Sequence, residues 1–245
     1  IIFHYLPMCG VVIAFQNYRP AKGLFGSNWV GLKHFQAFFS SIYAVRLIKN
    51  TIMINVLLLT FSFPAPIILA LLLNEVKNKH FKKTIQTISY MPHFISMVVI
   101  CGLLVDFCSS TGIITTITTL FGAQRDNLLN RPELFRTIYI ASDIWQSVGW
   151  GSIIYLATLS GTDPNLYEAA DLDGAGKLKQ AFSITIPMIM PTIIVMLIIR
   201  VGYLMDAGFE QVYTMISSTT RKTGEIIGTY VYRISLGENA GNYGF

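Results

Sequence analysis

A long apolar segment of the sequence holds one charged residue, Asp143, which has polar and aromatic neighbours at helical spacing. At about 100° per residue, Gln146, Ser147 and Trp150 fall within roughly 100° of arc around it. A carboxylate and an amide can hydrogen-bond to sugar hydroxyls, and an indole ring can stack on the apolar face of a sugar. The stripe therefore predicts a saccharide-binding surface. An equally weighted alternative is that Trp150 belongs to an interfacial aromatic belt and Asp143 pairs with a basic residue such as Arg200.

A segment near residue 170 predicts two short helices joined by a turn. Asp163 is a suitable helix N-cap and Pro164 suits a first turn, so we expect a helix through about Leu172. Gly174 or Gly176 offers the backbone freedom that ends such a helix. A second helix should then run into the apolar stretch that follows. The expected product is a hairpin lying on a membrane surface.

The charges of this hairpin are divided between its two halves. The first half is acidic and the second basic, at Asp163, Glu168, Asp171, Asp173, Lys177 and Lys179. A surface of this kind, with alanines that allow close approach, is typical of an element that docks into a groove on another protein. The run that begins at Gly174 is not a nucleotide-binding loop, because it lacks the earlier glycine and the serine or threonine after the lysine.

The composition indicates the environment in which these residues are held. Of the 245 residues, 53% are hydrophobic and 13% are charged, and the mean hydropathy is +0.54. A soluble domain has about twice this share of charge, and a disordered chain is far more polar. Three cysteines in or beside apolar runs do not suggest a secreted disulfide framework. The basic residues are spread over many loops, which argues against nucleic acid as a partner. An integral membrane protein is predicted.

Charge-poor windows predict an all-α, polytopic bundle of transmembrane helices. Crossing a bilayer takes roughly 20 helical residues. Five windows approach that length with at most one charged residue each: 1–18, 51–74, 84–105, 137–160 and 180–199. The sequence starts without a methionine inside the first window and stops in a polar segment, so we expect truncation at both ends. Helix kinks or hinges are predicted at Pro7, Pro64, Pro66, Pro92, Pro187 and Pro191.

The loops between the windows suggest an orientation. Residues 75–83 hold four lysines in nine positions, a density typical of a cytoplasmic loop. Alternation then places 161–179 inside as well, and the loops around 19–50, 106–136 and 200–245 outside. Because the outside loops are longer and hold 12 of the 18 basic residues, charge by itself does not settle the topology.

The hairpin carries a spacing that resembles a known family. It reads Glu168-Ala169-Ala170, three residues, Gly174, nine residues, Ile184, one residue, then Ile186-Pro187. This resembles the EAA loop of ABC-importer permeases and departs from it only in isoleucine at position 186, where leucine is usual. The flanking sequence resembles the type I carbohydrate-uptake (maltose-type) group, and within it the LplB-like polysaccharide and oligosaccharide branch. The resemblance covers essentially the whole chain.

The resemblance implies a fold and a role for the hairpin. It implies the type I permease fold with a six-span core, here a single transmembrane domain over residues 1–245 holding five of the spans. The loop 161–183 would be cytoplasmic and would couple a separate ATPase to the membrane helices. That ATPase would use the ATP, so no cofactor and no catalytic residue are implied in this chain. The implied coupling residues are Glu168, Ala169, Ala170, Asp173, Gly174 and Pro187.

The resemblance also implies a substrate and partners. Alternating access would carry a carbohydrate, as an oligosaccharide or polysaccharide fragment, across the bacterial cell membrane. The partners would be ABC ATPase subunits, a second permease subunit, an extracytoplasmic solute-binding protein and the lipid bilayer. The region after the fifth window resembles part of the family's translocation pathway. Together with the first stripe, the candidate pathway residues are Asp143, Gln146, Trp150, Tyr203, Phe209 and Glu210.

Two other classes of function stay open on the residues alone. A secondary transporter or channel would explain the apolar windows and the intramembrane Asp143, but it would leave the hairpin spacing to chance. An intramembrane aspartyl protease would need paired carboxylates such as Asp106 and Asp143 in compatible surroundings. The glycine-rich surroundings typical of such proteases are absent, and so are the HExxH and GxSxG motifs.

Overall fold

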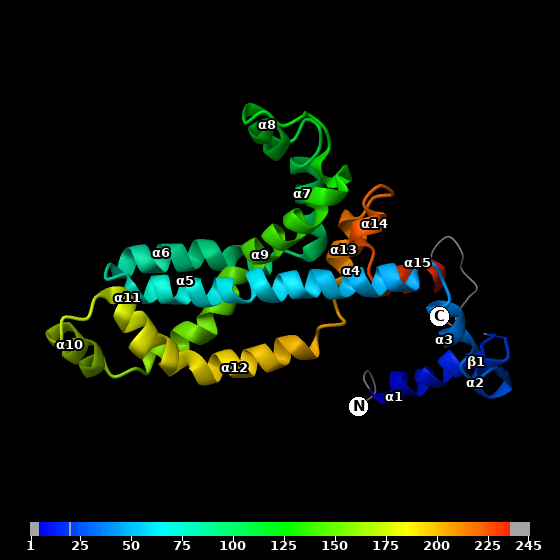
Figure 1. Ribbon diagram of the computed structural model, residues 1–245, viewed down its shortest axis with the longest axis horizontal. Helices are drawn as coiled ribbons and strands as arrows, with labels where there is room; N and C mark the ends of the chain where they lie inside the picture. Colours follow the sequence, from blue (N-terminus) through cyan, green and yellow to red (C-terminus); the bar gives the residue numbers. More distant parts are fainter. Residues whose placement is uncertain (1–4, 20, 236–245) are drawn as a thin grey trace.

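The computed structural model describes residues 5–19 and 21–235, which are mainly helical (Figure 1). In chain order the first elements are α1 (Tyr5–Met8), η1 (Cys9–Phe15), β1 (Gln16–Asn17), α2 (Gly23–Gly26), β2 (Asn28–Trp29), α3 (Lys33–Phe39), α4 (Ala44–Leu57), η2 (Leu58–Ser62), α5 (Pro64–Glu75), α6 (Lys79–Tyr90), η3 (Met91–Phe94), α7 (Met97–Phe107) and α8 (Ile113–Leu120). They are followed by η4 (Leu128–Asn130), α9 (Pro132–Ser160), α10 (Pro164–Leu172), α11 (Lys177–Gln180), η5 (Ala181–Thr185), α12 (Ile186–Gly202), α13 (Phe209–Met215), α14 (Arg221–Gly224) and α15 (Ile227–Ser235).

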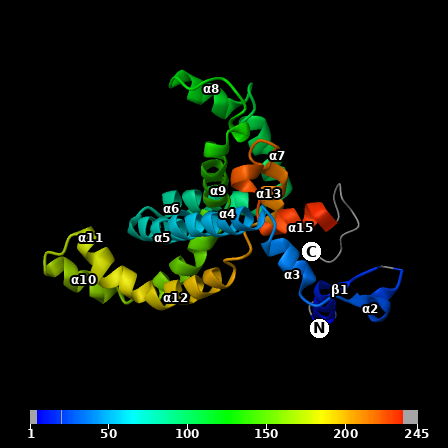
Figure 2. The same ribbon diagram turned by 45° about the vertical axis from the view of Figure 1, so that its right-hand side comes forward.

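A single continuous helix of 32 residues, built from α4, η2 and α5, is the central rod of the bundle. Helix α9 is 29 residues long and crosses this rod, packing mainly against α5. Helices α6 and α12 lie on opposite sides of the rod in both views, and each also packs against α9 (Figure 1 and Figure 2). The strands β1 and β2 form one short antiparallel pair, so the all-α prediction is confirmed apart from these few residues.

Two helices are long and apolar enough to cross a membrane, Ala44–Glu75 and Lys177–Gly202. A third crossing is added if Lys79–Phe94 and Met97–Phe107, which are bent by 99° at their break, are counted as one span. These segments contain three of the five predicted windows.

The other two windows differ from the prediction. The window 137–160 lies within α9, which is long enough to cross but carries charged and polar side chains along its length. Residues 1–4 of the first window lie outside the described residues, and its remainder forms the short elements α1 and η1. The end of the last loop, residues 236–245, also lies outside them.

The structure accommodates three of the predicted helix-breaking prolines in two ways, whereas Pro191 lies inside the regular helix α12. Proline lacks an amide hydrogen and its ring collides with the carbonyl four residues earlier. Directly before Pro64 and Pro187, the helix widens into the π-helical turns η2 and η5, which relieve this collision without ending the helix. At Pro92, by contrast, the chain forms the 3-10 turn η3 and then bends sharply into α7.

Two separate clusters of buried side chains stabilise the bundle, one toward each end. One cluster surrounds Phe135 and Tyr139 on α9, and another joins α5, α9 and α12 around Ile189. Beside the first cluster, the buried carboxylate of Glu225 accepts from Arg46 at 3.1 Å and from Arg233 at 2.9 Å. This pair of ion pairs fixes the start of α4 to α15.

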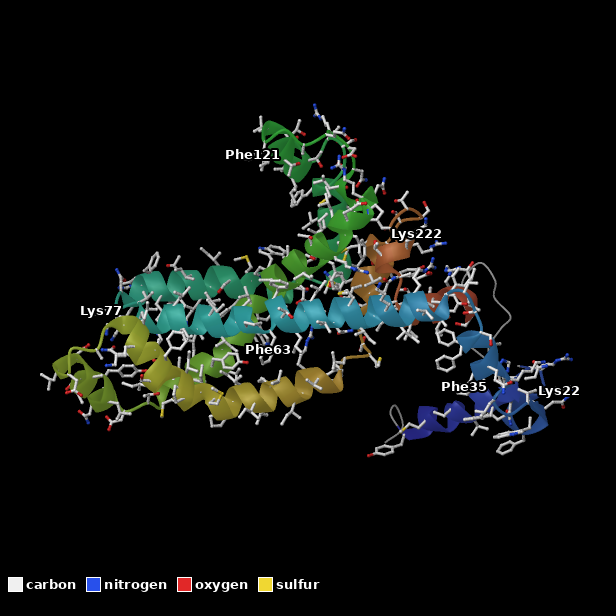
Figure 3. All side chains as sticks on the ribbon, in the orientation of Figure 1. Lys22, Phe35, Phe63, Lys77, Phe121 and Lys222 are labelled. Carbon is white, nitrogen blue, oxygen red and sulfur yellow. The ribbon has the colours of Figure 1, made fainter. Side chains whose placement is uncertain are left out.

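The hairpin and the lysine-rich loop lie at the same end of the molecule. Figure 3 labels Lys77 at that end, close to α10 and α11, and Lys222 toward the opposite end. The Nζ of Lys177 lies 3.9 Å from an Oε of Glu75, the last residue of the central rod. Residues 75–83 and 161–179 therefore lie at the same end of the molecule, as predicted.

Gly149 allows α9 to touch α6. A Cβ at this position would lie 2.1 Å from the carbonyl oxygen of Ser89, so Gly149→Ala must push the two helices apart. We expect a loss of about 1–3 kcal/mol in the free energy of unfolding, seen as a lower thermal midpoint in detergent. Gly102→Ala is the matched control, because nothing lies within 4 Å of its Cβ position. Equal midpoints for the two variants would contradict this account of the packing.

Candidate functional site

The first helix of the hairpin begins where its sequence predicts. The Oδ1 of Asp163 accepts from the backbone N–H of Asn165 at 3.0 Å, which caps α10, and Pro164 occupies the first turn. A side-chain acceptor satisfies an amide that would otherwise have no partner within the helix. Helix α10 ends at Leu172, so its predicted extent is confirmed.

The turn of the hairpin is a Schellman motif. The N–H of Ala175 donates to the carbonyl of Ala170 at 2.9 Å, and the N–H of Gly174 donates to the carbonyl of Asp171 at 3.1 Å. Gly174 has a φ of +70°, in the left-handed region that favours glycine. Gly176 has a φ of −66° and stands at the N-cap of α11. Of the two predicted glycines, Gly174 is therefore the one that the turn requires.

The first helix of the hairpin, α10, stands out from the bundle and is largely uncovered. No residue of α10 is buried, and Glu168, Ala169 and Asp173 are exposed, while Ala170 is half-buried. Leu172, at the tip, is 90% exposed. An apolar side chain held in this position suits contact with another protein.

The second half of the hairpin continues into a membrane-crossing helix. Helices α11, η5 and α12 form one apolar helix of 26 residues, Lys177–Gly202. Pro187 lies exposed at its junction with the π-helical turn. The far end of this helix reaches a cavity between the spans, so hairpin and cavity are parts of one continuous element.

The cavity has a volume of about 310 Å³ and lies between three helical segments. It is lined by Ser62, Phe63, Pro66, Asp143, Ser147, Gly151, Tyr155, Met196, Ile199, Arg200 and Tyr203. The carboxylate of Asp143 accepts a hydrogen bond from the hydroxyl of Ser62. The cavity therefore combines a hydrogen-bonded carboxylate, hydroxyls, aromatic rings and a guanidinium.

Arg200 is the cationic part of this cavity. Its side chain is half-buried, and it forms no ion pair with any residue of 5–19 or 21–235. The alternative in which Asp143 pairs directly with Arg200 is therefore not what the structure contains, although both line the same space. A guanidinium that forms no direct ion pair and lies beside polar groups is suited to bind a carboxylate.

The predicted stripe on α9 is divided between two environments. Asp143 and Ser147 face the cavity, together with Gly151. The amide of Gln146 instead donates to the carbonyl of Ile95 at 3.4 Å, near the break between α6 and α7. Trp150 also turns toward that break.

The rings of Trp150 and His93 are stacked there, with centroids 4.5 Å apart and an interplanar angle of 5°. His93 thus packs at the helix break, next to Pro92. The contact occupies one face of the Trp150 indole, although the side chain is still 46% exposed.

The candidate residues after α12 are also divided. Tyr203 lines the cavity with Asp143. Phe209 lies on α13 in an aromatic cluster with Tyr213 and Tyr232, at centroid distances of 5.5 and 5.3 Å. Glu210 is exposed on the same helix, outside the cavity.

Among the cavity-lining residues that sequence reasoning missed, Ser62 and Tyr155 carry polar groups. Ser62 lies 81 positions from Asp143 in the sequence, and no local pattern links them. Tyr155 is one helical turn beyond Gly151 on the i, i+4 row that starts at Asp143, so extending the stripe along that row would have found it.

Comparison with known proteins places this geometry in a family. Residues 62–238 match the family model of the binding-protein-dependent transport system inner membrane component. The chain is 46% identical, over 99% of its length and 76% of the relative's, to the polygalacturonan/rhamnogalacturonan transport system permease protein YteP of Bacillus subtilis. It is 43% identical, over 99% of its length and 77% of the relative's, to the protein LplB of the same organism.

Solved structures agree. The chain superimposes with a TM-score of 0.88 and 44% identity on a chain of a bacterial ABC transporter involved in the import of the acidic polysaccharide alginate, covering 98% of this chain and 81% of the other. A second structure is that transporter in complex with an alginate pentasaccharide-bound periplasmic protein, with a TM-score of 0.87.

The chain belongs to the family of binding-protein-dependent transport system inner membrane components. It is the membrane-spanning subunit of an ATP-driven ABC importer, a transport subunit rather than an enzyme, and it works with a separate ATPase and a solute-binding protein. The membership confirms the resemblance of its EAA spacing and decides against a secondary transporter or an intramembrane protease.

The exposed tip of the hairpin offers a test of orientation. Leu172→Cys, in a background without the native cysteines, should react with a membrane-impermeant maleimide only after the cytoplasmic face is opened. Phe121→Cys, 87% exposed in the loop expected outside, is the matched control and should react in intact cells. Labelling of both positions in intact cells would contradict a cytoplasmic hairpin.

Proposed function

We propose that this chain, as a single transmembrane domain, imports an oligosaccharide by alternating access and that loop 161–183 couples it to the ATPase. The observation that carries the proposal is the continuity of Lys177–Gly202, which joins the projecting hairpin to the polar cavity. A displacement of the hairpin by the ATPase would shift the cavity-lining residues at the other end of this helix. In this proposal the saccharide binds in this chain, whereas ATP is hydrolysed by the partner ATPase.

The coupling surface in this proposal is the uncovered face of the hairpin. Glu168 would supply a charge to the ATPase, and Ala169 and Ala170 would allow close approach. Asp173 and Gly174 would form the turn that ends α10 and so orients these residues toward the ATPase. Pro187 would fix the position at which the π-helical turn η5 ends and the regular helix α12 begins. Support comes from the exposure of α10 and from the Schellman geometry at its end.

The substrate in this proposal is an acidic oligosaccharide. The curated and structural relatives include a polygalacturonan/rhamnogalacturonan permease and an importer of the acidic polysaccharide alginate. In this chain the cavity offers the guanidinium of Arg200 for a carboxylate, the acceptor oxygens of Asp143 for hydroxyls and the ring of Tyr203 for stacking. Gln146, Trp150, Phe209 and Glu210 would contact the sugar elsewhere along its route.

A second permease subunit, homologous or identical, would complete the pathway. Within α12 only Ile189 is buried, and Met196, Ile199 and Arg200 of that helix line the cavity. Exposed apolar residues elsewhere on the helix, among them Ile194, Val195 and Ile198, are suited to lipid or to the partner. The solute-binding protein would deliver the saccharide to the opposite end from the hairpin.

The coupling role predicts a loss of transport in Glu168→Lys and in Gly174→Val. The first reverses an exposed charge, and the second forces a β-branched residue into the left-handed region at a cost of about 1–2 kcal/mol. Saccharide uptake and substrate-stimulated ATPase activity should fall about tenfold or more, with unchanged permease in the membrane.

Matched controls for these variants are Glu133→Lys and Gly176→Val. Glu133 is exposed at the start of α9, away from the hairpin, and Gly176 has an ordinary backbone conformation with open space at its Cβ. Both controls should transport at near wild-type rates. Wild-type coupling in Glu168→Lys and Gly174→Val would refute the role of this loop.

The acidic substrate predicts a charge requirement at Arg200. Arg200→Gln should raise the substrate concentration for half-maximal uptake of a uronate oligosaccharide about tenfold or more, because a charge-assisted hydrogen bond is lost. Uptake of a neutral oligosaccharide should not decrease. The measurement is competition between labelled uronate and neutral oligosaccharides in proteoliposomes, and an equal effect on both would contradict carboxylate recognition by Arg200.

A further inference from the structure

Gln180 differs from its neighbours in the hairpin because its side chain is buried. It is 1% exposed, whereas Lys177, Leu178 and Lys179, which complete helix α11, are exposed. A buried amide is stable only when its donors and acceptor are hydrogen-bonded. The hydrogen-bond partners of Gln180 therefore show which parts of the hairpin its side chain connects.

The amide of Gln180 connects every part of the hairpin. Its Nε2 donates to the Oδ1 of Asp171 on α10 and, at 2.9 Å, to the carbonyl of Ala175 in the turn. Its Oε1 accepts from the Nζ of Lys177 at 2.9 Å. A single side chain thus joins the first helix, the turn and the second helix.

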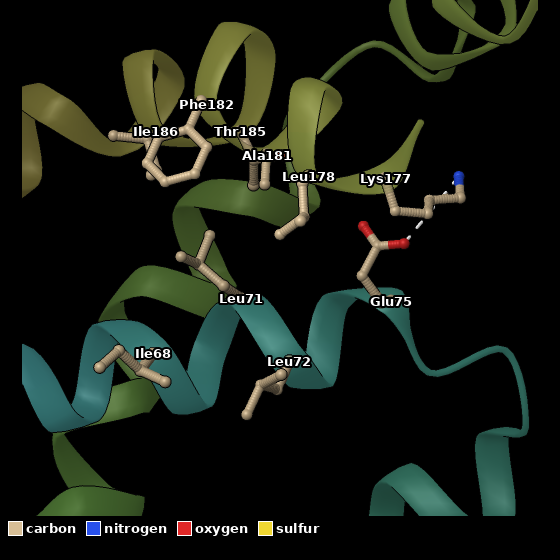
Figure 4. Close-up of a pocket in the computed structure, with 10 residues that line it drawn as sticks. All are labelled: Ile68, Leu71, Leu72, Glu75, Lys177, Leu178, Ala181, Phe182, Thr185 and Ile186. Atoms are coloured by element: carbon tan, nitrogen blue, oxygen red, sulfur yellow. Dashed lines mark ion pairs between the residues drawn. The ribbon is translucent and has the colours of Figure 1, made fainter. Parts of the chain in front are cut away.

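A second polar contact links the two helices nearer the membrane. The hydroxyls of Tyr167 on α10 and Thr185 in η5 lie 3.1 Å apart. Figure 4 shows Lys177 approaching Glu75 beside an apolar groove of about 240 Å³, which is lined by residues of α5, α11, η5 and α12. Because Lys177 and Glu75 are both exposed by more than a third, this ion pair adds little by itself.

Without these contacts the first helix would have little to fix its direction. No residue of α10 is buried, so apolar packing does not hold it against the bundle. Its connection to α11 runs through Gly174 and Gly176, two residues with wide backbone freedom. A push on α10 could then be absorbed by the turn instead of moving the membrane helix.

We propose that Gln180 is a positioning residue of the coupling step, which rests on the coupling role proposed for loop 161–183. Its amide holds α10 at a fixed angle to the helix Lys177–Gly202. Force applied by the ATPase to α10 is thereby passed to the residues that line the cavity. Gln180 needs no contact with the ATPase or the sugar to do so.

The variant Gln180→Glu tests the contact with little change of shape. In the assembled transporter, reconstituted with its ATPase and binding protein, a carboxylate at this position meets Asp171 and cannot donate to the carbonyl of Ala175. We expect about a fivefold or greater fall in saccharide transported per ATP hydrolysed, with unchanged amounts in the membrane.

A reversed pair and a matched control accompany this variant. In Asp171→Asn the side-chain oxygen still accepts from Gln180, and only the exposed ion pair with Lys177 at 3.8 Å is lost, so coupling should stay near wild type. In the double variant Asp171→Asn with Gln180→Glu, the asparagine amide donates to the new carboxylate while the bond to Ala175 stays absent, so coupling should recover about twofold or more over Gln180→Glu without reaching wild type. Failure of the double variant to recover would overturn the assignment.

Hydrogen exchange separates this proposal from the coupling role itself. The amides of α10 should exchange about tenfold faster in Gln180→Glu, while those of α9 and those of α10 in Glu168→Lys should not change. Unchanged exchange of α10 in Gln180→Glu, or faster exchange with wild-type coupling, would overturn the role of Gln180. In either case the loss or retention of uptake in Glu168→Lys would still decide whether the loop couples.

Discussion

The interior of a membrane offers no water to backbone N–H and C=O groups, so a helix that crosses it can be interrupted only where the protein satisfies those groups internally. In this chain Pro64 and Pro187 stand within the two long helices, and each follows a π-helical turn rather than a break. Helix α11, which is the second half of the hairpin, therefore forms a single unbroken helix with the π-helical turn η5 and α12. A mechanical connection from the cytoplasmic end to the cavity depends on that continuity.

The same device places a polar group in the membrane interior. The π-helical turn η2 ends at Ser62, whose hydroxyl donates to the carboxylate of Asp143 on α9. A carboxylate in a region of low dielectric is costly unless it is hydrogen-bonded, so this contact makes an intramembrane aspartate tolerable. Arg200 at the end of α12 then completes a cavity with charges of both signs. Accommodating proline and building a polar site are two consequences of one backbone adjustment.

Rigidity and exposure are distributed unevenly over the molecule. The end opposite the hairpin is fixed by the buried Glu225 between Arg46 and Arg233 and by the cluster around Tyr139. The hairpin has no apolar core and relies on a few hydrogen bonds, chiefly those of Gln180. An element that must meet another protein cannot bury its contact face within its own chain. Hydrogen bonds from Gln180 to Asp171 and Ala175 hold the hairpin without covering its exposed contact face.

The sequence alone determined the features that arise from neighbouring residues. The cap at Asp163, the extent of α10 and the apolar windows around residues 51–74 and 180–199 depend on short-range hydrogen bonding and local hydropathy. The spacing from Glu168 to Pro187 was sufficient to indicate the family, because the whole motif lies within one short stretch of the sequence. The sequence offered both Gly174 and Gly176 for the turn, and the structure shows that the local hydrogen bonds of the Schellman motif place the left-handed conformation at Gly174.

Tertiary structure also decided which way each side of α9 faces. A helical wheel gives the angles between residues but not the direction in which a neighbouring helix lies, so Asp143 and Trp150 appeared to share one surface. Packing against α5 and α12 turned Asp143 toward the cavity, and packing near the α6–α7 break turned Trp150 onto His93. The partner of Asp143 was beyond the reach of any local pattern, because Ser62 meets it only after two helices distant in the sequence have packed together.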